Sequence, residues 1–153
     1  MTEHVSRPEI RTVYVLNGPN LDLLGRRDPE VYATATLADV ETLCQEEASR
    51  LGLELVFRQS NHEGELIDWV HEAFDAGAAV VGNFGAYTHT SIAIMDALAV
   101  IEAPVVEVHI SDIHAREEFR HTSYVGLVAD AHVICHGIKG YVEALQQVVH
   151  LWT

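Results

Sequence analysis

The chain has little cysteine and little positive charge. Its two cysteines, Cys44 and Cys135, form no disulfide or metal-binding spacing and suggest a reducing compartment. Nine Lys and Arg residues stand against 23 Asp and Glu residues, which gives a formal net charge of −14. This balance argues against nucleic acid or an anionic membrane surface as partner. The few cationic residues can still be concentrated in one pocket that binds a small anion.

Long apolar runs are also missing. Residues 1–11 contain no apolar segment of the kind found in secretory signals, and no run approaches the length of a membrane span. We therefore expect a soluble, cytoplasmic protein with a flexible N-terminus over residues 1–11. With 153 residues and 48% hydrophobic content, residues 1–153 are expected to form a single domain with one core.

The common signatures of nucleotide and metal sites do not occur. There is no GxGxxG, no GxxxxGK and no HExxH. Among the ten histidines, His132 and His136 are the pair at i, i+4 spacing, and they span an expected strand end instead of one helix face. We therefore predict neither a metal nor a cofactor.

Short apolar runs alternate with amphipathic segments along the chain. The expected strands span residues 12–16, 53–57, 78–81, 105–110 and 131–135, and the expected helices span 36–51, 63–76, 90–101 and 137–151. Strands that alternate with helices predict a parallel sheet covered on both faces. The pattern fits an α/β, flavodoxin-like, doubly wound fold with five parallel strands.

Polar residues follow the carboxyl ends of several expected strands. Asn20 follows the first strand, Asn83 and His89 follow the third, and His109 and Ser111 close the fourth. Open parallel sheets bind ligands outside the carboxyl ends of their strands. We therefore expect these side chains to converge on one crevice.

The fourth expected strand places three polar side chains on one face. Glu107, His109 and Ser111 alternate with apolar residues, so all three point the same way. A carboxylate beside an imidazole favours its charged form and fixes its orientation, which suits a general acid. The alternative is a buried histidine that Glu107 binds for structural reasons alone.

Residues 17–32, NGPNLDLLGRRDPEVY, form a polar loop that is too long for a simple connection, and residues 20–33 are expected to be a lid. Tyr32 would act as a base at neutral pH only if its pKa fell about 3 units below ~10. Arg27 precedes Tyr32 closely enough to lower that pKa if the loop folds back. The alternative is a packed aromatic residue with solvated arginines.

Residues 82–91 lead into an expected helix start, where free N–H groups favour anions. An ordinary turn capped by Thr90 or Ser91 is the alternative.

Arg116 and Arg120 would lie on one side of a helical turn and could face the same ligand. They could equally pair with Glu117 and Glu118 on a solvated face.

Five segments together resemble the type II 3-dehydroquinate dehydratases. They read NGPNLDLLGRRDPEVY, RQSNHEGELIDWVHEA, NFGAYTHTSIAIMDAL, EVHISDIHAREEFRHTSY and IKGYVEAL, in the order and spacing of that family. The family consists of small flavodoxin-like lyases of the shikimate and quinate pathways. The resemblance implies loss of water from 3-dehydroquinate to give 3-dehydroshikimate, by anti elimination through an enolate, without a metal or a Schiff base.

The resemblance also implies individual roles. Tyr32 matches the base that removes the C2 proton, and Arg27 matches the lid arginine that lowers its pKa. His109 matches the general acid that protonates the departing C1 hydroxyl, and Glu107 orients it. Asn20 matches the residue that holds a water against the enolate oxygen. The positions that match substrate-binding residues are Asn83, His89, Ser111, Arg116, Arg120 and Asp96, the last of which reaches a neighbouring subunit's site in the family's trimer-based dodecamer.

Several residues depart from the family pattern. Ala33 stands where Gly is usual, and Asp112 stands where Asn is usual, which adds a negative charge near a pocket for an anion. Gly126 replaces the usual Ser, and Asp130 and His132 occupy a normally bland strand approach. Ala33 and Asp112 motivate an alternative function, a non-catalytic ligand-binding or regulatory module on the same fold. A histidine-based metal hydrolase is a further alternative.

Overall fold

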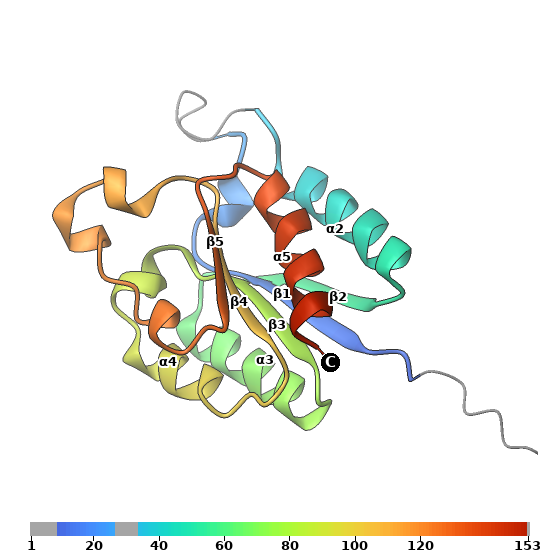
Figure 1. The fold of residues 1–153 in the computed structure, drawn as a ribbon. Helices are drawn as coiled ribbons and strands as arrows, with labels where there is room; N and C mark the ends of the chain where they lie inside the picture. Colours follow the sequence, from blue (N-terminus) through green and yellow to red (C-terminus); the bar gives the residue numbers. More distant parts are fainter. Residues whose placement is uncertain (1–8, 27–33, 153) are drawn as a thin grey trace, which may run out of the picture.

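A five-stranded parallel sheet forms the centre of the structure (Figure 1). The computed structural model describes residues 9–26 and 34–152. Its strands are β1 (Thr12–Asn17), β2 (Glu54–Gln59), β3 (Ala79–Asn83), β4 (Val105–His109) and β5 (Ala131–Ile134). They lie in the order β2-β1-β3-β4-β5, and every neighbouring pair is parallel. The predicted doubly wound, flavodoxin-like architecture is confirmed.

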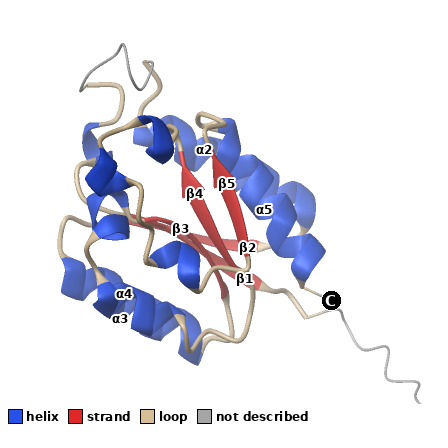
Figure 2. Ribbon diagram, turned by 60° about the vertical axis from the view of Figure 1, so that its left-hand side comes forward, coloured by secondary structure: helices blue, strands red, loops and turns tan. Residues whose placement is uncertain are grey.

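Helices cover both faces of the sheet (Figure 2). Helices α2 (Leu37–Leu51) and α5 (Lys139–Leu151) pack on one face, and α3 (Glu63–Asp75) and α4 (Ile92–Leu98) pack on the other. Because successive strand residues point to opposite faces, β1 supplies Val15 to the first layer and Leu16 to the second. No helix in the described part of the chain is long and apolar enough to cross a membrane.

The ends of α2 follow from local sequence signals. Thr36 accepts a hydrogen bond from the amide of Asp39, and the Asp39 carboxylate accepts one from the amide of Thr36, which is a capping box. Gly52, with φ 72°, ends the helix in the left-handed conformation that glycine adopts without strain.

Helix α4 is shorter than predicted. Its N-cap is Ser91, whose Oγ accepts from the amide of Ile94, and the helix ends at Leu98 instead of at residue 101. The amides of Val100 and Ile101 bond three residues back, to Ala97 and Leu98, so the chain tightens into turns before Pro104. The predicted end was wrong because apolar spacing continues through these turns.

The loops after β1 and β3 lie against each other at the carboxyl end of the sheet. The Gly18 amide donates to the Asn83 carbonyl over 2.8 Å, and a Cβ on Gly18 would lie 2.2 Å from the Phe84 carbonyl oxygen. Only glycine permits this approach. Beyond it, Leu21–Leu23 form a 3-10 turn, and Leu24 is buried in the core beneath α2 and α5.

Candidate active site

A cavity of about 150 Å³ opens at the carboxyl ends of β1, β3 and β4. The structure brings most of the candidate polar side chains to this cavity. Those that line it are Asn20, Asn83, His89, His109, Ser111, Arg116 and Arg120. Several of them are far apart in the sequence, and the parallel register of the sheet is what gathers them.

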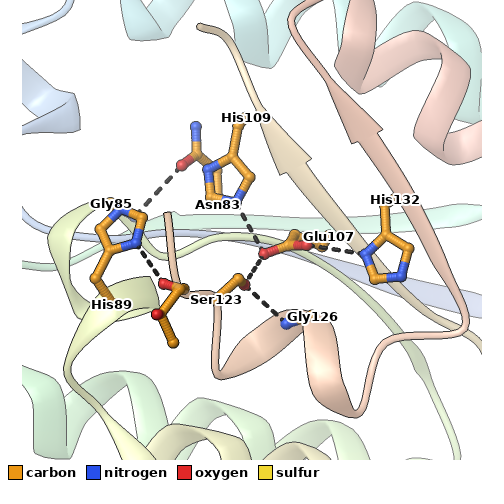
Figure 3. Close-up of polar contacts among 9 residues, drawn as sticks. Asn83, Gly85, His89, Glu107, His109, Ser123, Gly126 and His132 are labelled. Atoms are coloured by element: carbon orange, nitrogen blue, oxygen red, sulfur yellow. Dashed lines mark hydrogen bonds and ion pairs between the residues drawn. The ribbon is translucent and has the colours of Figure 1, made fainter. Parts of the chain in front are cut away.

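His109 and Glu107 form a buried pair at the end of β4 (Figure 3). Nε2 of His109 lies 2.9 Å from Oε2 of Glu107, and the two residues are 5% and 1% exposed. An ionised carboxylate only accepts hydrogen bonds, so Nε2 carries the proton in this contact. The other ring nitrogen, Nδ1, is left to exchange a proton with a ligand in the cavity.

The Glu107 carboxylate stays ionised although it is buried. Burial alone would raise its pKa, but hydrogen bonds from His109, Ser123 and His132, together with the charge of His109, outweigh burial and lower the pKa to about 2. Ser123 Oγ donates to Oε2, and Nδ1 of His132 lies 2.9 Å from Oε1. This carboxylate therefore keeps its negative charge beside His109 at every pH near neutrality.

His89 lies over His109 in the cavity, with their ring centroids 6.5 Å apart. Burial lowers the pKa of His89, and the nearby His109 and Arg120 lower it further, against a hydrogen bond to Thr122 that raises it. The Nδ1–H group of His89 donates to the Thr122 carbonyl over 2.8 Å. A neutral His89 therefore offers Nε2 as an acceptor for a ligand hydroxyl.

The Asn83 side chain is fixed by a buried network. Its Nδ2 donates to the Tyr141 hydroxyl over 3.0 Å, and its Oδ1 accepts from the Gly85 amide over 3.3 Å. The Tyr141 hydroxyl in turn donates to Asn17 Oδ1 over 2.7 Å. Asn17 is fully buried and supports the site from behind.

Arg116 and Arg120 line the cavity and also pair with Glu117. The two arginines can thus face a ligand, as the first alternative predicted, and they also pair with an exposed glutamate, as the second predicted. Nε of Arg120 lies 2.8 Å from the Glu117 carboxylate, and Nε of Arg116 lies 3.9 Å from it. Because Glu117 is exposed, water weakens its pairing with the two arginines. Arg116 and Arg120 therefore still contribute positive potential to the cavity that they line.

The added charge at Asp112 has a local partner. Its carboxylate accepts from the His114 amide over 2.9 Å and caps the 3-10 turn Ile113–Ala115. Asp112 is not among the described residues that line the cavity. Within residues 9–26 and 34–152, no group of three or more His, Cys, Asp or Glu side chains is arranged to hold a metal ion.

Comparison with known proteins matches residues 11–149 to the family model of class II dehydroquinases. The chain belongs to the class II dehydroquinase family. The 3-dehydroquinate dehydratase of Acidovorax ebreus is 57% identical over 140 residues, which cover 88% of this chain and 95% of that protein. The solved type II dehydroquinase of Propionibacterium acnes has a TM-score of 0.88 and 44% identity, over 92% of this chain and 97% of that one. A type II dehydroquinase from Butyrivibrio crossotus has a TM-score of 0.89 at 39% identity, over 92% and 98%.

Two described candidate residues of this class II dehydroquinase, Glu107 and Asp96, are not among the residues that line the cavity, and Glu107 contacts the lining residue His109. Asp96 is exposed on α4 and lies apart from the cavity lining. Tyr32 and Arg27 lie outside the described residues, as does Ala33, so the proposed base and its arginine stay predictions.

The structure adds residues to the site that the sequence pattern did not indicate. Ser123 and His132 both hold Glu107, and Tyr141 holds Asn83. His132 and His136, the histidine pair at i, i+4 spacing, have separate partners: His132 contacts Glu107, and His136 pairs with Glu143. Alternation along β5 indicates the face of the sheet to which His132 points. Its contact with Glu107 also depends on the pairing of β5 with β4, which local sequence patterns do not reveal.

Proposed function

We propose that this chain is a 3-dehydroquinate dehydratase that eliminates water from 3-dehydroquinate to give 3-dehydroshikimate. The observation that carries the proposal is the His109–Glu107 pair at a cavity lined by Asn20, Asn83 and Arg120, in a chain of the class II dehydroquinase family. Relatives of this family carry the same enzyme name over nearly their whole length.

The proposed reaction is an anti elimination through an enolate. The Tyr32 phenolate, favoured by Arg27, takes the proton from C2, and the electron pair moves into the carbonyl to form the enolate. Asn20 holds a water against the enolate oxygen. The enolate then expels the C1 hydroxyl, which takes a proton from His109 and leaves as water. No metal or cofactor takes part in these steps.

The electrostatics of the site support an anionic substrate. The protein has a formal net charge of −14, yet Arg116 and Arg120 stand at the cavity rim with no carboxylate among the described lining residues. Ser111, His89 and Asn83 supply further hydrogen-bonding groups for the carboxylate and hydroxyls of the substrate.

His109 is well placed to be the general acid. Ionised Glu107 accepts from Nε2 and holds the ring, so that a proton on Nδ1 can pass to the leaving hydroxyl. The leaving group would otherwise depart as hydroxide, which is a poor leaving group at neutral pH.

We further propose a cytoplasmic dodecamer built from trimers. Exposed Asp96 on α4 would then reach the site of a neighbouring subunit. A monomer of full activity in solution would contradict this assembly.

The test is the growth of ultraviolet absorbance from the enone carboxylate on mixing with 3-dehydroquinate. Tyr32→Phe and His109→Gln should each lose most turnover while still binding the substrate, and His71→Gln, at an exposed position on α3, should keep it. Turnover near the native value in Tyr32→Phe would refute the base, and in His109→Gln would refute the acid.

A non-catalytic binding module on the same fold has less support. Asp112, one of the two residues that motivated it, caps a turn and does not line the cavity. Measurable binding of 3-dehydroquinate with no turnover by the native protein would favour it over the dehydratase.

A further inference from the structure

One carboxylate in this protein bridges two imidazoles from adjacent strands. Glu107 on β4 and His132 on β5 are direct partners in the register of the sheet. Oε1 of Glu107 lies 2.9 Å from Nδ1 of His132, and Oε2 lies 2.9 Å from Nε2 of His109 (Figure 3). Each carboxylate oxygen of Glu107 thus contacts one histidine: Oε2 contacts buried His109, and Oε1 contacts His132.

The space around Oε1 is shaped for this contact. Gly126 lies beside it, and a Cβ at that position would come within 3.1 Å of both Oε1 and Ser123 Oγ. Ser123 accepts from the Gly126 amide over 2.8 Å and donates to Oε2, so it leaves Oε1 to His132. Gly126 and His132 are also two of the three positions near this strand where the sequence departs from the family it resembles, the third being Asp130.

Glu107 and His132 differ in their exposure to solvent. Glu107 is 1% exposed, whereas the side chain of His132 is 44% exposed. His132 therefore exchanges protons with solvent directly and contacts the carboxylate that supports His109.

We propose that His132 is a positioning residue that acts through Glu107 and sets how strongly Glu107 holds the proton of His109. When it is neutral, His132 donates one N–H to Oε1 and reduces the negative charge available to His109. When it is protonated, it places a second cation on the same carboxylate and competes with His109 directly. The inference rests on the proposed function only where it takes His109 as the acid.

Among the described residues, four charged or titratable side chains face His109. They are Glu107 on β4, His89 in the loop after β3, and Arg116 and Arg120 at the rim of the same cavity. The arginines keep their charge, Glu107 stays ionised because its pKa is about 2, and burial lowers the pKa of His89 and keeps it neutral. Unlike these groups, His132 reaches His109 only through Glu107, and its side chain is exposed to solvent.

The experiment compares two substitutions with one control. His132→Val suits a strand but removes the donor, whereas the amide nitrogen of His132→Asn can take the position of Nδ1. His136→Asn is the matched control, because this exposed neighbour pairs with Glu143 and not with Glu107. The readouts are the pH profile of kcat, KM, and the NMR titration of the His109 ring in the resting protein.

In His132→Val, Glu107 should hold the His109 proton more tightly. The alkaline limb of kcat should move up by about 0.5 pH unit, and kcat should fall by up to about threefold because a more tightly held proton is a weaker acid. KM should change less than about twofold, since His132 does not line the cavity. His132→Asn and His136→Asn should keep the native profile above pH 7.

Any other pattern overturns the proposal. A His132→Val profile within about 0.2 unit of the native one, or moved to lower pH, would leave His132 with no influence of the stated sign. His132→Asn behaving like His132→Val would exclude the N–H donor as the cause. The NMR titration needs no turnover, so it decides this inference even if the native protein proves inactive and the proposed function fails.

Discussion

The Tyr141 hydroxyl accepts a 3.0 Å hydrogen bond from Nδ2 of Asn83, which joins the last helix to the end of β3. Burial raises the pKa of Tyr141, so the phenol stays neutral and can accept from Asn83 while it donates to Asn17. One hydroxyl thus satisfies two buried amides, one of which lines the cavity.

Tyr141→Phe should therefore cost both stability and substrate affinity. The change leaves groups of Asn17 and Asn83 buried without partners, so the free energy of unfolding should fall by about 1–3 kcal/mol. KM should rise because the Asn83 side chain then keeps only its contact with the Gly85 amide. Denaturant titration and steady-state kinetics measure the two effects. Tyr87→Phe, which removes an exposed bond to the Asn61 carbonyl, should cost less, and an equal loss would contradict the role of the buried network.

Stability should decline in acid through Glu107. The pKa of Glu107 lies at about 2, below its ordinary value of 4.5, so the folded state binds this proton less readily than the unfolded state. The stabilisation is complete above pH 4.5 and is lost as the pH falls towards 2, on the order of 3 kcal/mol in all.

Glu107→Gln should flatten this acid branch in unfolding measurements at a series of pH values. Glu65→Gln, which changes an exposed carboxylate on α3, should leave the branch as it is in the native protein. An unchanged acid branch in Glu107→Gln would show that other groups govern the loss.

Asp112→Asn should leave the kinetics almost unchanged. The Asn side chain still offers an oxygen to the His114 amide, and the lost charge does not line the cavity. We expect KM for 3-dehydroquinate within about twofold of native, whereas Asp112→Ala should lose about 1 kcal/mol of stability with its cap. A several-fold lower KM in Asp112→Asn would instead mean that this charge opposes binding.

Local patterns in the sequence predicted much of the fold and part of the site. Alternation along one strand placed Glu107 and His109 on the same face, and strand ends predicted where the cavity would lie. These inferences work because side-chain direction and the carboxyl end of a strand are properties of a short segment.

The parts that were missed depend on distant residues. His132 meets Glu107 only because β5 pairs with β4 in one register, and Tyr141 meets Asn17 from 124 residues away. The end of α4 was missed for a different reason, since apolar spacing does not distinguish a helix from the tight turns that follow Leu98.

The contact between Gly18 and Phe84 limits how this protein can evolve. Because a Cβ at position 18 would lie 2.2 Å from the Phe84 carbonyl oxygen, no other residue can replace Gly18 without displacing one of the two loops. Selection for a different carboxylic acid substrate would therefore act on the other residues that line the cavity, such as Ser111, Arg116 and Arg120, and would leave Gly18 unchanged.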